Sequence, residues 1–185
     1  MRIIAGQYRG KNLSAGSDLS IRPIKNRLKE TIFSIIHEYI DDKRILDLFS
    51  GSGSLGIEAL SRGARHLTFV EREESSIKVL NKNLKDLHID PKYIKIVKSD
   101  VLEYLEKNSN DYHLIFSDPP FKYQFLQQMV NQVFVNDHLV RNGLVVLHHE
   151  IDNPLNEDNV PYTLLKQKKI GRSILSFITK EATDD

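Results

Sequence analysis

The fold is decided by the stretch Asp47-Leu48-Phe49-Ser50-Gly51-Ser52-Gly53-Ser54-Leu55-Gly56. An apolar run ends at its start and a helical pattern begins at its end, which predicts a tight turn from a buried strand into a helix. The glycines Gly51, Gly53 and Gly56 match G-x-G-x-x-G, and Glu71 lies 20 residues after Gly51. Glycines alone would indicate only a tight turn. With an acid at that distance they favour a nucleotide-type ligand at the strand ends.

Strands and helices alternate on both sides of this stretch. Strands are predicted at 44–49, 66–70, 93–97, 113–117 and 143–148, with helices between them at 55–62, 73–87, 102–107 and 125–134. Two further strands, 162–169 and 173–179, flank a short turn that contains Gly171 and predict an antiparallel hairpin. The pattern predicts an α/β fold: a Rossmann-like, doubly wound, mostly parallel sheet that ends in a C-terminal antiparallel hairpin.

The N-terminal part of the chain is basic. We expect a small β-hairpin that turns around residues 6–10, with basic residues at its tip, and then a helix from Pro23 to Tyr39. Seven bases and two acids give residues 1–30 a charge of +5, whereas the whole chain sums to +1. Such an asymmetry points to a polyanion partner, although a solvated basic face is its commoner cause.

The composition excludes several classes of protein. The 185 residues include no cysteine, which excludes a disulfide scaffold, a thiolate zinc site and a cysteine nucleophile. No apolar run reaches the ~18 residues of a membrane span, and the N-terminus lacks the apolar core of a signal peptide. The seven histidines show no metal-ligand spacing, so no metal is predicted. These features favour a soluble, cytoplasmic protein without membrane contact.

Asp47 directs the choice of ligand toward a cation. It lies in the strand just ahead of the glycine turn, where its carboxylate would oppose a pyrophosphate and favour the ammonium and sulfonium groups of S-adenosylmethionine. Glu71 suits the hydroxyls of a ribose, because a carboxylate accepts hydrogen bonds. Asp100 follows the third predicted strand, where it would cap the next helix and could also receive an adenine amino group.

The segment Ser117-Asp118-Pro119-Pro120-Phe121 follows the fourth predicted strand. Two prolines end a strand, but that role does not explain an acid and an aromatic residue on either side of them. The Asp118 carboxylate and the Pro119 carbonyl could each accept an N–H from a planar exocyclic amine. They would then stabilise the positive charge that develops as the amine attacks a methyl group. The prolines stiffen the two acceptors, and Phe121 could stack on an extruded base.

Together these motifs resemble a known family. Asp-Pro-Pro-Phe at 118–121 is similar to the catalytic motif of methyltransferases that act on exocyclic amines. With residues 47–56, the chain resembles class I S-adenosylmethionine-dependent methyltransferases. Segments 2–11, 22–23, 27–30 and 33–36 resemble the opening of the bacterial 16S ribosomal RNA guanine-N2 methyltransferase family usually called RsmD, and the match runs to about residue 179.

The resemblance implies a cofactor, a substrate and a set of site residues. The cofactor would be S-adenosylmethionine, and a monomer would methylate N2 of one guanine in 16S rRNA, within a 30S subunit or an assembly intermediate. Catalysis is assigned to Asp118, Pro119, Pro120 and Phe121. Cofactor contacts are assigned to Asp47, Phe49, Gly51, Gly53, Glu71, Arg72, Asp100 and Val101. RNA contacts are expected at Tyr8, Arg9, Lys11, Arg22, Lys25 and Arg27. Residues 1–40 would form a basic, RNA-facing hairpin and helix and residues 41–181 the methyltransferase catalytic domain, packed as a single compact unit.

Two positions depart from the family pattern, and other functions stay open. Asn26 lies in a stretch that differs from the family, and His148 stands where an acid is expected. A DNA adenine-N6 or protein-glutamine methyltransferase would use the same amine chemistry, although such enzymes usually carry a larger recognition region. An NAD-dependent dehydrogenase fits the glycines and Glu71 but gives residues 118–121 no task. A non-catalytic RNA-binding module would not need the Asp118 carboxylate.

Overall fold

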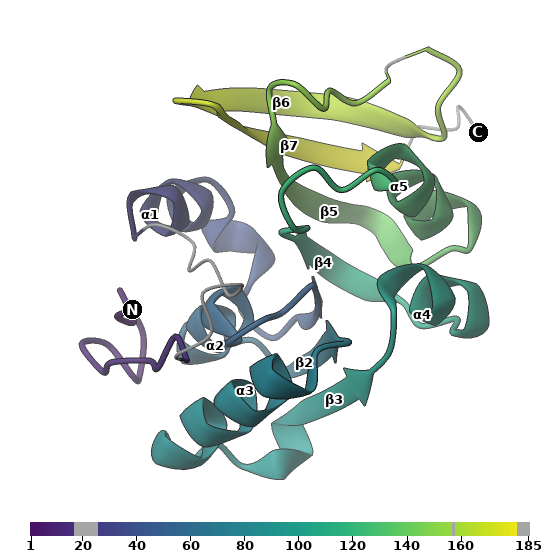
Figure 1. Ribbon diagram of the computed structural model, residues 1–185. Coiled ribbons are helices and arrows are strands. Elements are labelled where there is room, and N and C mark those ends of the chain that lie inside the picture. Colours follow the sequence, from purple (N-terminus) through teal and green to yellow (C-terminus); the bar gives the residue numbers. More distant parts are fainter. Residues whose placement is uncertain (17–25, 157, 181–185) are drawn as a thin grey trace.

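A seven-stranded sheet runs through the centre of the molecule, in the strand order β3-β2-β1-β4-β5-β7-β6 (Figure 1). The computed structural model describes residues 1–16, 26–156 and 158–180. The strands are β1 (Arg44–Leu48), β2 (His66–Glu71), β3 (Ile94–Lys98), β4 (Tyr112–Ser117), β5 (Leu139–Glu150), β6 (Tyr162–Ile170) and β7 (Ser173–Lys180). The α-helices are α1 (Asn26–Ile35), α2 (Ser54–Ser61), α3 (Glu74–Asp86), α4 (Val101–Lys107) and α5 (Leu126–Val135). Two short 3₁₀ helices are η1 (His37–Tyr39) and η2 (Pro91–Tyr93).

The order of the strands defines where a ligand can bind. Strands β1 to β5 pair in parallel, and β7 runs antiparallel to both β5 and β6. The first strand, β1, lies inside the sheet. The next two strands, β2 and β3, are added outward on one side of β1, and β4 is then added on its other side. In open α/β sheets, ligands bind at such a reversal, outside the carboxyl ends of the strands. The predicted doubly wound sheet with a terminal hairpin is therefore confirmed, and its reversal lies between β1 and β4.

Helices cover both faces of the sheet (Figure 1). One face packs against α1, α2 and α3 through a core that includes Ile32, Leu60 and Leu80. The opposite face packs against α4 and α5 through a second core that includes Leu105 and Met129. Because the parallel strands are buried on both faces, their sequences are nearly continuous apolar runs rather than alternating ones. No helix within the three described ranges is long and apolar enough to cross a membrane.

Two of the predicted strands and helices differ from the structure by more than two residues at an end. The strand predicted at 143–148 extends over Leu139–Glu150, because its first residue pairs with Tyr112 of β4 and its last residue pairs with Ser173 of β7. The helix predicted from Pro23 to Tyr39 is described from Asn26 and ends at Ile35. It gives way to η1 because Ile36 leaves the α-helical conformation, with φ −100° and ψ 14°.

The predicted N-terminal β-hairpin is wrong in its extent. Its two arms meet in a single antiparallel bridge, between Arg2 and Asn12, and no strand forms within residues 1–16. The physical reason is competition from α2. Backbone N–H groups of the first arm bond to this helix instead of to the second arm: Ile4 N donates to Glu58 Oε2 at 2.9 Å, and Ala5 N donates to Glu58 Oε1 at 3.0 Å. The turn is also held on α2, because Gln7 N donates to the Ser61 carbonyl at 2.8 Å and Tyr8 N donates to Ser61 Oγ at 3.0 Å.

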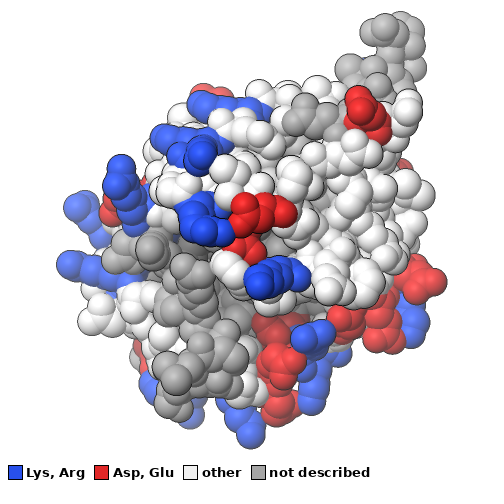
Figure 2. Space-filling model, turned by 45° about the horizontal axis from the view of Figure 1, so that its top comes forward, with Lys and Arg blue, Asp and Glu red and all other residues white. Residues whose placement is uncertain are grey.

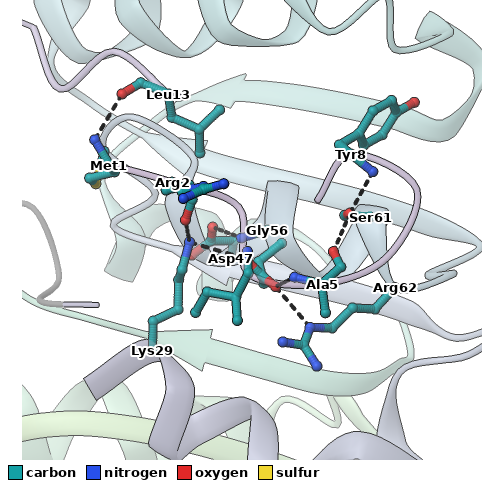
Figure 3. A network of polar contacts seen from close by, with 12 residues as sticks. Met1, Arg2, Ala5, Tyr8, Leu13, Lys29, Asp47, Gly56, Ser61 and Arg62 are labelled. Carbon is teal, nitrogen blue, oxygen red and sulfur yellow. Dashed lines mark hydrogen bonds and ion pairs between the residues drawn. The ribbon is translucent and has the colours of Figure 1, made fainter. Parts of the chain in front are cut away.

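A buried ion pair holds the N-terminal segment and α1 on α2 (Figure 3). Lys29 and Glu58 are both fully buried, with Lys29 Nζ 3.0 Å from Glu58 Oε2. Glu58 also accepts the backbone N–H groups of Ile4 and Ala5, and Arg62 Nε donates to it at 2.9 Å. Burial lowers the pKa of Lys29 despite the neighbouring carboxylate. Burial alone would raise the pKa of Glu58, but the Ile4 N–H and Lys29 lower it overall.

Candidate active site

Four carboxylates lie at the carboxyl ends of four adjacent strands. Asp100 follows β3, Glu71 ends β2, Asp47 lies in β1 and Asp118 follows β4. Adjacent strands are about 4.8 Å apart, so the row spans about 14 Å along the sheet edge. The charges of Asp118 and Glu71 both act on Asp47, which shows that the three groups are close in space.

Asp47 is buried beneath the glycine turn. Its Oδ2 accepts the backbone N–H of Gly56 at 3.0 Å. A Cβ at Gly56 would stand 3.0 Å from that oxygen and 2.3 Å from Leu67, so only glycine lets the helix approach the carboxyl this closely. Burial, together with the charges of Asp118 and Glu71, raises the pKa of Asp47 to about 8, although the hydrogen bond from Gly56 lowers it. The ligand-free site therefore favours a protonated Asp47, which a nearby cation would reverse.

Glu71 holds the backbone of the glycine turn. Its Oε2 accepts from Gly51 N at 2.8 Å, and its Oε1 accepts from the backbone N–H groups of Arg72 and Glu73. A carboxylate offers about four lone-pair positions. Three of them are used, so Glu71 retains capacity for one further donor. The sequence predicts that Glu71 accepts two ribose hydroxyls, and it can do so only if one of its three backbone hydrogen bonds opens.

The glycine turn takes backbone conformations that favour glycine. Gly51 has φ 53° and Gly53 has φ 81°, and a Cβ on Gly53 would stand 2.4 Å from Leu80 of α3. Phe49 also has a positive φ, of 58°, and its half-buried ring meets Tyr123 edge to face at 5.0 Å. These residues bring the start of α2 against the sheet edge at the strand-order reversal.

Asp100 begins α4 and faces an arginine. Its Oδ1 accepts the backbone N–H of Leu102 at 2.9 Å, which is an N-terminal cap. Its Oδ2 lies 3.7 Å from Arg72, whose side chain is largely exposed. Val101, the first residue of α4, is buried. Asp100, Val101 and Arg72 therefore lie at the β3 end of the carboxylate row.

The segment 118–121 leaves β4 beside β5. The Pro120 carbonyl accepts the backbone N–H of Tyr123 at 3.1 Å, whereas the Pro119 carbonyl accepts no hydrogen bond from another described residue. Phe121 is 59% exposed, a high value for an aromatic side chain. The arrangement leaves a backbone carbonyl and an aromatic face next to the Asp118 carboxylate.

His148 is a site residue to which sequence reasoning gave no role. It lies on β5, and its Nδ1 is 2.6 Å from Asp118 Oδ1. The signal in the sequence was indirect, since His148 stood out only as a departure from the family pattern. Its contact with Asp118 depends on the pairing of β4 with β5, which brings together residues that are 30 positions apart.

A hollow of about 340 Å³ opens beside Phe121. It is lined by Phe121, Lys122, Tyr123, Gln124, Glu150, Asp152, Asn153 and Arg172. Glu150 Oε2 accepts from Lys122 N, and Asn153 Nδ2 donates to the Tyr123 carbonyl, so side chains from β5 and the loop after it fix this segment. Burial raises the pKa of Tyr123 to about 12. A hollow with an aromatic wall and fixed polar groups suits a planar ligand.

Three of the basic residues predicted to meet RNA lie on the surface of the N-terminal part. Arg9, Lys11 and Arg27 are exposed, while Tyr8 is half-buried against the core of α1, α2 and α3. Arg22 and Lys25 lie outside the described residues. On the face shown in Figure 2, lysine and arginine predominate on the left and acidic side chains at the lower right. Within the described ranges, no group of three or more histidines and acids could hold a metal ion.

Comparisons with known proteins identify relatives over the whole chain. The family model described as "Conserved hypothetical protein 95" matches residues 1–179. The chain is 37% identical over 174 residues to "Ribosomal RNA small subunit methyltransferase D" of Haemophilus influenzae, covering 92% of this chain and 89% of that protein. It is 32% identical over 182 residues to the protein of the same name from Escherichia coli K12, covering 98% and 91%. The solved structure "Putative methyltransferase yhhF from Escherichia coli" superposes with a TM-score of 0.85 at 30% identity, over 99% of both chains. The fold is thus that of the class I methyltransferases.

Proposed function

The chain belongs to the family described as conserved hypothetical protein 95, the RsmD family of the sequence-based prediction, and from this membership we propose that it methylates the exocyclic N2 amine of a guanine in 16S rRNA. It is a methyltransferase, and its methyl donor is S-adenosylmethionine. The observation that carries the proposal is the carboxylate row, which ends at Asp118, the first residue of the Asp118–Phe121 segment. Relatives named for ribosomal RNA of the small subunit support the choice of substrate. The cytoplasm is the proposed compartment.

The residues at the sheet edge fit S-adenosylmethionine along the whole row. Asp100 would receive the adenine amino group, Glu71 a ribose hydroxyl through its remaining lone-pair position, and Asp47 the positive charge of the methionine part. The raised pKa of Asp47 supports this order, because a buried carboxyl is stabilised as an anion by an adjacent cation. The walls of the S-adenosylmethionine site would be completed by Phe49, Gly51, Gly53, Arg72 and Val101. This order directs the methyl group toward Asp118.

The segment 118–121 would hold the accepting amine. S-adenosylmethionine, when bound, supplies a methyl carbon attached to a positively charged sulfur. The lone pair of the guanine N2 would form the new N–C bond, and the C–S bond would break with its electron pair left on sulfur. The Asp118 carboxylate and the Pro119 carbonyl accept the two N–H groups and stabilise the positive charge on nitrogen. One proton then leaves the nitrogen for Asp118, which is a quarter exposed and releases it to water. Phe121 stacks on the extruded base.

The N-terminal part would hold the RNA backbone. Arg9, Lys11 and Arg27 are exposed cations within the segment of charge +5, and their contacts with phosphates would make binding fall steeply with salt. Tyr8 would contribute the exposed part of its ring by stacking, and Arg22 and Lys25 belong to the same proposed surface. We propose residues 1–40 as the RNA-facing part and 41–181 as the catalytic part. The enzyme would act as a monomer on a 30S subunit or an assembly intermediate.

Methylation of unmodified small subunits tests the proposal directly. The protein is incubated with labelled S-adenosylmethionine and either unmethylated 30S particles or 16S rRNA, and the labelled nucleotide is mapped. Label on guanine N2 is expected, and Asp118→Ala is expected to lose turnover while S-adenosylhomocysteine still raises the melting temperature. If label appears only on DNA adenine or on a protein side chain, the assignment of 16S rRNA as the substrate is wrong. Stabilisation by NADH but not by S-adenosylhomocysteine would overturn the reaction class.

A further inference from the structure

His148 and Asp118 form a close pair at the reacting end of the site. Ser117, the last residue of β4, lies opposite Leu147 of β5. The next residues, Asp118 just after β4 and His148 in β5, therefore stand side by side. His148 Nδ1 and Asp118 Oδ1 are 2.6 Å apart, and the side chains are 23% and 25% exposed. Such a short distance is typical of a hydrogen bond to a charged acceptor. The pair is therefore partly exposed, within reach of a substrate and of water.

The neighbouring histidine shows what a purely structural role looks like in this strand. His149 is buried and points to the opposite face of β5, where its Nε2 lies 2.8 Å from Ser176 Oγ and its Nδ1 lies 2.9 Å from the Asn153 carbonyl. Both of its nitrogens have partners in the protein interior. Among the described residues, His148 instead bonds only to the carboxylate to which the proposed reaction assigns the amine.

The direction of the bond follows from the chemistry of the acceptor. An ionised carboxylate has no hydrogen to donate, so the hydrogen must stand on His148 Nδ1. The bond occupies Oδ1 and limits rotation of the carboxylate. Oδ2 is then left to accept the amine N–H. An acid at position 148, as the family pattern leads one to expect, could not supply this hydrogen when ionised and would repel Asp118.

We propose that His148 is a positioning residue for methyl transfer, which holds the Asp118 carboxylate in the orientation that receives the guanine amine. This inference rests on the proposed function. It assigns His148 no contact with the methyl donor, so its effect should fall on turnover rather than on cofactor affinity. Small displacements of a reacting group can cost up to about 100-fold in rate, and the loss of a supporting hydrogen bond commonly costs about 10- to 100-fold.

Two substitutions at position 148 separate positioning from packing. His148→Ala removes the donor and is expected to lower kcat by about 10- to 100-fold, with the affinity for S-adenosylhomocysteine unchanged within about twofold. His148→Asn places an amide N–H near the position of Nδ1 and is expected to recover most of the lost kcat. In an Asp118→Asn background, His148→Ala should cost little more, because the two residues act as a unit. His113→Ala, at the other end of β4, is the matched control and should leave kcat unchanged.

The possible outcomes distinguish this inference from the proposed function. If the wild-type protein methylates guanine N2 and His148→Ala keeps its kcat, or if Ala and Asn lose it equally, positioning by His148 is overturned and the proposed function stands. If the wild-type protein does not methylate the RNA, the proposed function falls and this inference falls with it. Nitrogen NMR gives a readout independent of activity, since the neutral ring should carry its hydrogen on Nδ1. A hydrogen on Nε2 alone would also overturn the inference.

Discussion

Replacing Asp47 by Asn should change how the stability of the ligand-free protein depends on pH. Burial raises the pKa of Asp47 from 3.8 to about 8 in the folded protein. The unfolded chain releases this proton near pH 4, whereas the folded chain retains it up to about pH 8. Because the folded state binds more protons in this window, the contribution of Asp47 to stability is fully present below pH 4. It is lost progressively as the pH rises toward 8.

The size of the effect follows from the displaced pKa. One proton bound by the folded state and not by the unfolded state costs about 1.36 kcal/mol of unfolding free energy per pH unit. Between pH 5 and pH 7, both inside the window, wild type should lose about 3 kcal/mol that the Asn variant does not lose. The Asn side chain has no proton to release, and its amide oxygen can still accept from Gly56 N. Urea denaturation of both proteins at pH 5, 6 and 7, at one ionic strength, measures the difference.

The refuting result is a pair of parallel curves. If the unfolding free energies of wild type and Asp47→Asn differ by a constant across this range, the Asp47 carboxyl does not retain its proton in the folded state. Calorimetry tests the same carboxyl in the presence of ligand. At pH 7, S-adenosylmethionine binding should release a proton from wild type, and the variant should bind more weakly without that release. If wild type and variant bind S-adenosylmethionine with equal affinity and no proton is released, Asp47 does not contact the ligand and only positions α2.

Three further predictions concern other parts of the molecule. Glu58→Ala leaves Lys29 buried without its partner and should cost about 3–5 kcal/mol of unfolding free energy, measured by urea denaturation. Gly6→Ala should lower the melting temperature much more than Gly171→Ala, although both glycines have positive φ. A Cβ at Gly6 would stand 1.7 Å from the last carbonyl oxygen of α2, whereas nothing lies within 4 Å at Gly171. Phe121→Ala should leave the unfolding free energy within about 0.5 kcal/mol of wild type, because the ring is exposed, yet weaken RNA binding by about 1–3 kcal/mol in a titration with the substrate RNA.

The order of elements was predictable because each carries its signal locally. Apolar runs marked the buried strands, and helical periodicity marked the segments between them. The extent of β5 was not predictable in this way. Its first residues, Leu139-Val140-Arg141-Asn142, include polar positions that belong to the strand only because Tyr112 of β4 pairs with Leu139. The N-terminal hairpin failed for the same reason, since Glu58 on α2 accepts the backbone N–H groups of Ile4 and Ala5 in its first arm.

The candidate site was predictable where one residue sits at the end of one strand. Glu71, Asp100 and Asp118 each follow or end an apolar run, Asp47 lies near the end of one, and the parallel sheet places such residues at one edge. What could not be predicted is how each carboxylate is already used. The backbone bonds to Glu71 and the contact of His148 with Asp118 arise from tertiary neighbours, which no local pattern records.

The carboxylate row opposes the stability of the ligand-free protein, which is an argument that it serves a ligand. The charges of Asp118 and Glu71 add to burial in raising the pKa of Asp47, so the fold works against a charge at Asp47. Buried acids without a paired cation are costly, and the described residues place no lysine or arginine within ion-pair distance of Asp47. The same protein satisfies Glu58 with Lys29 and Arg62, so it can neutralise a buried acid where structure alone requires it. An acid at Asp47 that lacks such a partner, at the strand-order reversal, is best explained by a positive charge that arrives with the ligand.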